Sequence, residues 1–250
     1  MCHDHDSRPP APPRSGTVAA RESLVLTSAD GTRFAAAYAA PETTPGTGVV
    51  ILPDIRGLHP YYVALAERFA EAGVAAAAID WFGRTAGVPD SGTRGEDFAW
   101  QEHIPQTTAE GIDADIVAAM AALRERHGDD LPIVTVGFCF GGSHSWRQSG
   151  GDLDLAGCAG FYGRPSMVAD AAGRAHLPTV MLIAGADQAT PVEDQLALAA
   201  TMRAAGADVD APVYDGAPHS FFDRAYGEWS DACRDAWEHV LTLTDRVSRA

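Results

Sequence analysis

Gly137-Phe138-Cys139-Phe140-Gly141-Gly142 is the stretch that decides the fold of this 250-residue chain. It follows the apolar run 132–136 and precedes residues that can continue as a helix. The pattern predicts a strand, a sharp turn with a thiol at its apex and a helix, with flanking glycines where a Cβ would not fit. A helix N-terminus also favours a thiolate. Cys139 is therefore a candidate nucleophile, although a buried structural cysteine beside a glycine-rich turn would show the same pattern.

Strands and helices are predicted to alternate on both sides of this turn. Residues 23–27 and 33–39 predict an N-terminal hairpin, because Asp30 and Gly31 between them favour a tight turn. Later apolar runs alternate with helix-compatible stretches, which is typical of βαβ units. We therefore expect an α/β fold with a mainly parallel, doubly wound sheet and helices on both faces. The expected strands are 48–52, 74–79, 133–136, 155–161, 179–184 and 208–214; the expected helices, besides the one after the turn, are 61–72, 108–126, 191–205 and 226–247.

Length and composition favour one folded domain. With 46% hydrophobic residues the chain can bury one large core, and we expect a single domain over residues 21–250. Residues 1–20 are rich in proline, serine and charge, and we expect them to form a disordered tail. Residues 83–106 combine glycine, proline and charge with aromatic side chains. A loop of that length is usually functional, so this segment is a candidate lid.

Charge and cysteine content restrict the possible partners. The net charge is −16 and all 18 basic residues are arginines, which excludes nucleic-acid and anionic-membrane partners because both require a basic patch. No apolar run is long enough for a transmembrane helix, and the N-terminus lacks the apolar core of a secretory signal. The cysteines show no paired spacing, so we expect a reducing cytoplasm. Four clustered side chains in this tail could capture a metal ion: His3, Asp4, His5 and Asp6. A solvated tail is the favoured interpretation.

A cysteine nucleophile requires a base and a third group that orients the base. In a parallel sheet these belong on loops after later strands, at the edge that carries the turn, in the order nucleophile, acid, histidine. Asp187 follows the strand expected over 179–184, and His219 follows the one expected over 208–214. Alone, Asp187 would be interpreted as a turn or helix N-cap residue and His219 as a structural loop histidine. Together, in this order, they favour a Cys-His-Asp triad.

The remaining histidines that we weighed fit the role of base less well. His127 and His239 fall on or beside predicted helices, and His176 lies in a linker, so structural roles are favoured for them. His144, on the helix after the turn, and His103, in the candidate lid, are the alternatives that can approach the site.

Residues 22–245 resemble the dienelactone hydrolase family of α/β-hydrolases. The superfamily usually has serine where this chain has Cys139, so the cysteine makes the match more specific. The resemblance implies the α/β-hydrolase fold. The matching segments are Gly137-Phe138-Cys139-Phe140-Gly141-Gly142, Ala184-Gly185-Ala186-Asp187, Pro218-His219-Ser220-Phe221, Pro53-Asp54-Ile55-Arg56-Gly57-Leu58 and Phe161-Tyr162-Gly163.

The resemblance also implies a mechanism. Cys139 is then the nucleophile, His219 the general base and Asp187 the acid that orients it. The backbone N–H groups of Phe140 and Ile55 form the implied oxyanion hole. No metal or organic cofactor is implied, the partner is a small-molecule ester or lactone, and the protein is a monomer or small homo-oligomer.

Two features depart from the family archetype, in which a glutamate contacts the thiol and two arginines bind a substrate carboxylate. The glutamate position is Asp54, one methylene shorter, which alternatively is a turn residue. One arginine position corresponds to Arg84. The other is Asp223, with Arg224 beside it, so the identity of the substrate stays open. Two further candidate contacts are Arg56 and Tyr162, although for Arg56 the role of an ordinary surface arginine is favoured.

The favoured function is therefore hydrolysis of a lactone or activated ester through a thioacyl-enzyme. The alternative is a non-catalytic or weakly active ligand-binding relative of the same fold, favoured by the changes at Asp54 and at the second arginine. A third hypothesis, a thiol redox protein, would need Cys158 to lie near Cys139 in space, because no resolving cysteine lies near in sequence.

Overall fold

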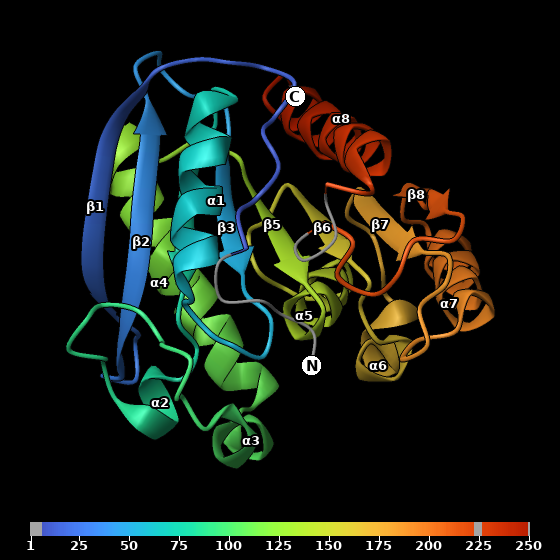
Figure 1. Cartoon of the computed structure of the whole chain (residues 1–250), viewed down its shortest axis with the longest axis horizontal. Coiled ribbons are helices and arrows are strands. Elements are labelled where there is room, and N and C mark those ends of the chain that lie inside the picture. Colours follow the sequence, from blue (N-terminus) through green and yellow to red (C-terminus); the bar gives the residue numbers. More distant parts are fainter. Residues whose placement is uncertain (1–6, 223–226, 250) are drawn as a thin grey trace.

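The computed structural model of the chain describes residues 7–222 and 227–249. Within these residues nine strands form one sheet in the order β1-β2-β4-β3-β5-β6-β7-β8, with β9 paired to β7. Figure 1 shows them from β1 at the left to β8 at the right. The strands are β1 (Val18–Thr27), β2 (Arg33–Pro41), β3 (Gly48–Leu52), β4 (Ala75–Ile79), β5 (Ile133–Phe138), β6 (Gly157–Phe161), β7 (Thr179–Ala184), β8 (Val209–Asp210) and β9 (Val213–Tyr214).

The sheet is antiparallel at one edge and parallel elsewhere. β1 pairs with β2 and β2 with β4 in antiparallel register, whereas the pairs from β4 through β3, β5, β6 and β7 to β8 are parallel. The α/β prediction with a mainly parallel sheet is thus confirmed. β5 lies between β3 and β6, so the turn that follows β5 lies in the middle of the carboxyl edge, where ligands bind in such sheets.

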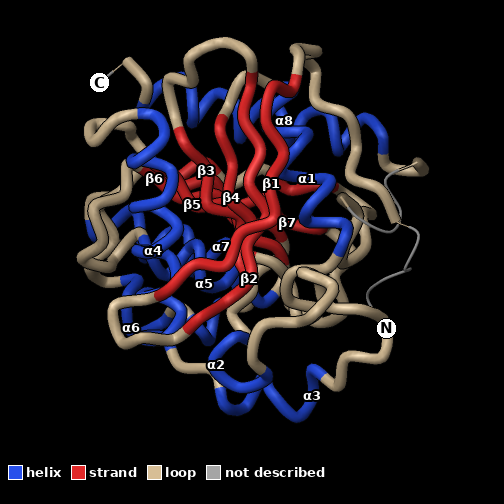
Figure 2. Tube along the Cα trace, turned by 90° about the vertical axis from the view of Figure 1, so that its left-hand side faces the viewer, coloured by secondary structure: helices blue, strands red, loops and turns tan. Residues whose placement is uncertain are grey.

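Helices cover both faces of the sheet, as expected from the continuous apolar strands (Figures 1 and 2). Val49 and Ile51 of β3 pack into the core under α1 and α8, and Val50 and Leu52 face the core under α4. The long helices are α1 (Pro60–Glu71), α4 (Ala109–His127), α5 (Phe140–Gln148), α7 (Val192–Ala205) and α8 (Ser230–Val247); the short ones are α2 (Gly83–Ala86), α3 (Trp100–His103), η1 (Ile104–Gln106), η2 (Pro165–Met167) and α6 (Ala169–Ala172).

The prediction of a disordered tail over 1–20 is wrong for the residues that the structure describes. Pro9 and Pro10 are buried, and the Trp237 indole N–H donates to the Pro10 carbonyl at 3.1 Å. Arg14 forms an ion pair with Asp245, and β1 already begins at Val18. The prolines are apolar and pack on α8, which composition alone did not reveal. The tail side chains His3, Asp4, His5 and Asp6 lie outside the described residues, as does Cys2.

Two further segments differ from the prediction. The strand expected over 208–214 is split into β8 and β9, because Pro212 lies between them and has no N–H for the sheet. The segment 83–106, expected as a loop, contains α2 and α3 and ends in the 3-10 helix η1. The strands expected over 48–52 and 179–184 have the predicted positions. The predicted hairpin is present, but its strands are longer than expected, Val18–Thr27 and Arg33–Pro41.

Candidate active site

Cys139 lies at the apex of the turn between β5 and α5, in the backbone conformation that the motif predicted. Its φ is +54°, a left-handed value that is costly for a residue with a side chain. The Cys139 N–H donates to the Phe161 carbonyl of β6 at 3.0 Å, and the Cys139 carbonyl accepts from the Ser143 N–H at 3.1 Å. The strained apex is therefore fixed by both the neighbouring strand and the helix that it begins.

The glycines around Cys139 are required by close backbone contacts. A Cβ on Gly137 would lie 2.0 Å from the Gly141 carbonyl oxygen, and a Cβ on Gly141 would lie 2.1 Å from that of Leu52. A side chain at Gly137 would force α5 away from β5, and one at Gly141 would force α5 away from the end of β3. The glycines thus bring the turn directly against the loop 53–59, which follows β3.

Asp187 and His219 form a hydrogen-bonded pair on adjacent loops. The His219 Nδ1 lies 2.7 Å from Asp187 Oδ2, and the Asp187 side chain is fully buried. The other oxygen, Oδ1, accepts the backbone N–H groups of Ala189 at 2.8 Å and Thr190 at 3.3 Å. One carboxylate oxygen therefore holds its own loop and the other holds the imidazole. Asp187 is not the N-cap of α7, whose N-cap is Pro191.

Cys139 and His219 line the same cavity, which has a volume of about 290 Å³. The segment 83–106, the candidate lid, contributes Trp100 and Ile104 to its wall. The other described residues that line it are Ile55, Phe140, Ser143, Tyr162, Arg164, Met167, Ala189 and Thr190.

Phe140 and Ile55, the predicted oxyanion-hole residues, lie at this cavity. Phe140 is the first residue of α5, so its N–H has no acceptor within the helix. Ile55 lies in the loop after β3, which Gly141 holds against the turn. Both residues line the cavity beside Cys139.

Asp54 is engaged by neighbours of its own loop and helix. The Arg56 guanidinium donates to both carboxylate oxygens, with Nη2 at 2.8 Å from Oδ2, and the Tyr62 hydroxyl donates to Oδ2 at 2.6 Å. Asp54 and Arg56 are buried, and neither is among the described residues that line the cavity. These contacts give both residues a role in the shape of the loop that carries Ile55.

Arg84, predicted as a substrate contact, is engaged elsewhere in this structure. Its guanidinium forms ion pairs with Asp30 and with the buried Asp115 at 2.8 Å, and its Nε donates to the Gly111 carbonyl. It is not among the residues lining the cavity. A buried carboxylate needs a cation, and Asp115 on α4 directs this arginine away from the site. The other proposed contact, Arg224, lies outside the described residues together with Asp223.

Sequence reasoning missed Arg164, a cation at the edge of the cavity. Its backbone N–H donates to Ser143 Oγ at 2.8 Å, and its side chain is exposed. The available signal was its position directly after Phe161-Tyr162-Gly163. Tyr162, which was predicted, is buried with its ring centroid 4.8 Å from that of His219.

Burial removes other ionisable groups from consideration at this site. Burial lowers the pKa of His144 to about 3, and its ring packs against Phe140, so it is neutral at physiological pH and unsuited to act as a base. His103 stacks on Phe98. Burial also raises the pKa of the Cys158 and Cys233 thiols to about 12. Of the other histidines that were weighed, His127 bonds to Tyr38, His176 to Arg174 and His239 to Asp210.

Comparison with known proteins relates the chain to one family. Residues 34–248 match the model of the Dienelactone hydrolase family. A protein of Saccharolobus solfataricus named "Putative carboxymethylenebutenolidase" is 26% identical over 91% of this chain and 100% of its own length. A protein of Escherichia coli K12 with the same name is 26% identical over 84% of this chain and 82% of its own length.

Solved structures share the fold at lower identity. A "Putative Dienelactone Hydrolase" from Klebsiella pneumoniae superposes with a TM-score of 0.76 at 22% identity, covering 90% of this chain and 99% of its own. A dienelactone hydrolase-like promiscuous phosphotriesterase from metagenomic libraries gives 0.71 at 22% identity, covering 92% and 99%. Among residues 7–222 and 227–249, no helix is long and apolar enough to cross a membrane. The same residues contain no cluster of three His, Cys, Asp or Glu that could hold a metal ion.

Proposed function

Because the chain belongs to the dienelactone hydrolase family and is a carboxylic ester hydrolase, we propose that it cleaves a lactone or activated ester through Cys139, His219 and Asp187. The observation that carries the proposal is the His219–Asp187 hydrogen bond of 2.7 Å at a cavity that Cys139 also lines. A nucleophile, a base and a group orienting the base then meet at one site.

In the first half-reaction the Cys139 thiol gives its proton to His219 Nε2, and Sγ attacks the carbonyl carbon. The resulting oxyanion accepts hydrogen bonds from the backbone N–H groups of Phe140 and Ile55. When the C–O bond breaks, the leaving oxygen takes the proton from His219, and the acyl group stays on Sγ as a thioester. In a lactone the leaving oxygen remains attached to the acyl group through the opened ring.

In the second half-reaction a water molecule replaces the alcohol. His219 takes a proton from the water, which attacks the thioester carbonyl, and the same two N–H groups hold the second oxyanion. Collapse releases the carboxylic acid, and His219 returns the proton to the Cys139 thiolate. Asp187 accepts the Nδ1–H throughout, which keeps Nε2 directed toward the reacting atoms and stabilises the imidazolium.

The two alternatives receive less support. A non-catalytic relative was suggested by the changes at Asp54 and at the second arginine position, Asp223, which lies outside the described residues. The hydrogen bond between His219 and Asp187 at the cavity that Cys139 lines weighs against it. For a thiol redox protein, Cys158 is fully buried within β6, and burial raises its pKa to about 12. A thiol of that kind is a poor resolving partner.

A panel of aryl esters and lactones tests the proposal. We expect turnover by the wild type and a loss of at least about 1000-fold in kcat/KM for Cys139→Ala, as for removal of a catalytic nucleophile. The matched control is Cys233→Ala, which removes a buried thiol that does not line the cavity. If no member of the panel is hydrolysed in a Cys139-dependent way, the proposal fails.

A further inference from the structure

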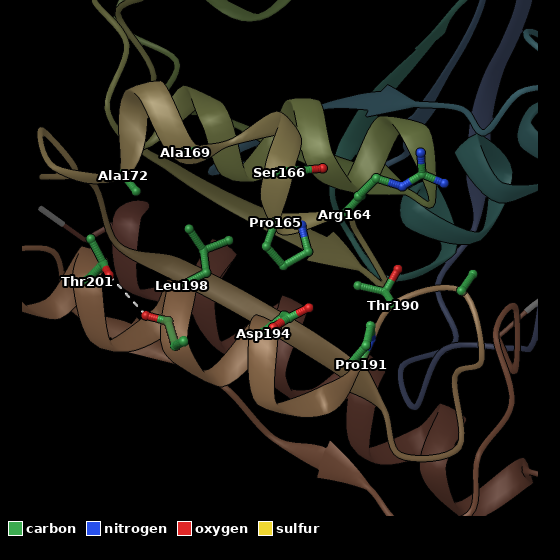
Figure 3. A pocket seen from close by; sticks show the side chains of 12 residues that line it. Arg164, Pro165, Ser166, Ala169, Ala172, Thr190, Pro191, Asp194, Leu198 and Thr201 are labelled. Atoms are coloured by element: carbon green, nitrogen blue, oxygen red, sulfur yellow. Dashed lines mark hydrogen bonds between the residues drawn. The ribbon is translucent and has the colours of Figure 1, made fainter.

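A second hollow opens directly beside the candidate active site. It has a volume of about 600 Å³ and lies between the η2–α6 segment and the beginning of α7. Figure 3 shows Arg164 and Thr190 at one end and Ala172 and Thr201 toward the other. Because Arg164, Ala189 and Thr190 line both this groove and the cavity with Cys139, the two spaces adjoin at these residues. We refer to it as the α6/α7 groove.

The walls of the α6/α7 groove are mostly apolar. Pro165 from η2 and Leu198 from α7 point toward one another across it (Figure 3), with Ala169 on the η2–α6 side. Its charged lining residues are of opposite sign, Arg164 at the end nearest the cavity and Asp194 on α7. The apolar walls favour an uncharged hydrocarbon surface, and the two charges together favour neither an anion nor a cation.

The cavity itself leaves little room for a large substrate. At about 290 Å³ it lies at the lower limit of the roughly 300–1,000 Å³ that is typical of ligand sites. A small lactone fits such a space, whereas a longer ester must extend beyond it. The hollow that adjoins the cavity among the described residues is the α6/α7 groove.

The residues at the junction indicate which part of the ester leaves through this exit. Ala189 and Thr190 donate their N–H groups to Asp187, whose other oxygen holds His219. The junction therefore lies on the side of the catalytic acid and base. The leaving oxygen must come within hydrogen-bond reach of His219 Nε2, so the alcohol attached to it lies on this side as well. Trp100 and Ile104 reach the cavity from a different segment.

We propose that the α6/α7 groove binds the alcohol part of the ester, and that the enzyme accepts esters whose alcohol carries an extended, uncharged alkyl or aryl arm. The inference rests on the proposed function, since it assigns the groove to the leaving group of the Cys139 reaction. It assigns Pro165, Ala169, Ala197 and Leu198 as residues that select the length of this arm.

Two matched ester series test the assignment. In the first, the acyl group is acetyl and the alcohol is phenol, 4-butylphenol or 4-hexylphenol, so that the leaving-group chemistry stays nearly constant. In the second, the alcohol is phenol and the acyl group is acetyl, butanoyl or hexanoyl. A fully buried methylene raises binding about fourfold. We therefore expect the wild type to prefer 4-hexylphenyl acetate over phenyl acetate by at least about tenfold in kcat/KM.

Variants that fill the groove then show whether it binds the alcohol part or the acyl part of the ester. Ala197→Trp on α7 should lower the ratio of kcat/KM for 4-hexylphenyl acetate to that for phenyl acetate by about tenfold or more, and should leave the acyl-series ratio unchanged. Ala169→Trp, from the opposite wall, provides a second obstruction if the first variant does not fold. Ala200→Trp is the matched control, because Ala200 is an exposed residue of α7 that does not line the groove.

Each outcome decides the question. A fall in the alcohol-series ratio in a groove variant and not in Ala200→Trp supports the assignment. A fall in the acyl-series ratio instead, or no change in either ratio, overturns it while the Cys139 mechanism stands. Full turnover by Cys139→Ala overturns the proposed function, and this inference with it.

Discussion

The elbow, residues 137–142, and the segment 83–106 both form walls of the candidate active site, but they are held in place differently. The elbow is fixed by backbone contacts so close that a Cβ on Gly137 or Gly141 would lie about 2 Å from a carbonyl oxygen. The segment is fixed by buried charge: the Arg94 guanidinium donates to Asp80 Oδ2 at 2.8 Å. The difference shows why a short sequence motif can specify the elbow, whereas the position of the segment 83–106 depends on a residue outside it, Asp80.

The buried pair also connects the segment to the oxyanion loop. The Asp80 carboxylate accepts the Leu58 N–H at 3.3 Å, and the Arg94 N–H donates to the Leu58 carbonyl at 2.9 Å. The Arg94 guanidinium also lies over the Phe98 ring, 4.7 Å from its centroid. Leu58 belongs to the same loop as Ile55, so Asp80 and Arg94 position two walls of the cavity together.

The largest effect is expected in the elbow. Gly141→Ala places a methyl group 2.1 Å from the Leu52 carbonyl oxygen, and neither backbone can move without displacing α5 or β3. We expect a loss of at least about 3 kcal/mol in the free energy of unfolding, measured by urea titration. Gly173→Ala is the control, because nothing lies within 4 Å of its Cβ position. Wild-type stability of Gly141→Ala would show that the turn is not held by close packing.

For Arg94→Met we expect a loss in the free energy of unfolding that is similar to or smaller than that of Gly141→Ala and that depends on pH. Burial raises the pKa of Asp80, and Arg94 opposes that rise, so the variant leaves a fully buried carboxyl with a higher pKa still. A group whose pKa is higher in the folded state stabilises the fold below its unfolded value near 3.8, and this contribution is lost as the pH rises through the folded pKa. We expect a loss of about 3–5 kcal/mol at pH 8 and a smaller loss at pH 5.

Urea unfolding of Arg94→Met at both pH values checks this prediction. The double variant Asp80→Asn, Arg94→Met should lose the pH dependence, because the titrating carboxyl is gone. An equal loss for the single variant at pH 5 and pH 8 would contradict the role given to the buried Asp80 charge.

A moderate effect on stability, and none on substrate choice, is expected for Arg84→Gln. The side chain pairs with the buried Asp115, so its removal should cost about 1–3 kcal/mol. The ratio of kcat/KM for a carboxylated ester to that for its neutral analogue should equal the wild-type ratio, measured beside the surface control Arg68→Gln. A selective loss of the carboxylated ester would return Arg84 to the substrate site.

The residues changed in these three variants differ in how far the sequence could predict their positions. The alternation of strands and helices, the turn at Cys139 and the order of Asp187 and His219 follow from local pattern and sheet topology, and the structure places Asp187 and His219 in contact. Arg84 could not be placed, because its direction depends on Asp115 on α4, and the packing of Pro10 depends on Trp237 on α8. Such long-range partners leave no periodic signal. Arg164 was missed because the one signal for it was its position directly after Phe161-Tyr162-Gly163, and a single exposed arginine has no periodic pattern.

No reaction is expected at the two buried thiols. Since burial raises the pKa of Cys158 and Cys233 to about 12, only about one thiol in 10,000 is ionised at pH 8, and the thiolate is the reactive form. Native protein treated with iodoacetamide should carry no label at either residue by peptide mass spectrometry, whereas urea-unfolded protein should carry both. Labelling of the native protein at either residue would contradict the burial on which the redox hypothesis was set aside.

The most direct measurement is the alkylation rate of Cys139 at pH 6.5 in the wild type and in His219→Ala, followed by mass spectrometry of the Cys139 peptide. If His219 activates the thiol, the wild type should react at least about tenfold faster than free cysteine, and His219→Ala should react at about the rate of free cysteine. Equal rates in the two proteins, or a wild-type rate no higher than that of free cysteine, would contradict a nucleophile activated by the His219–Asp187 pair.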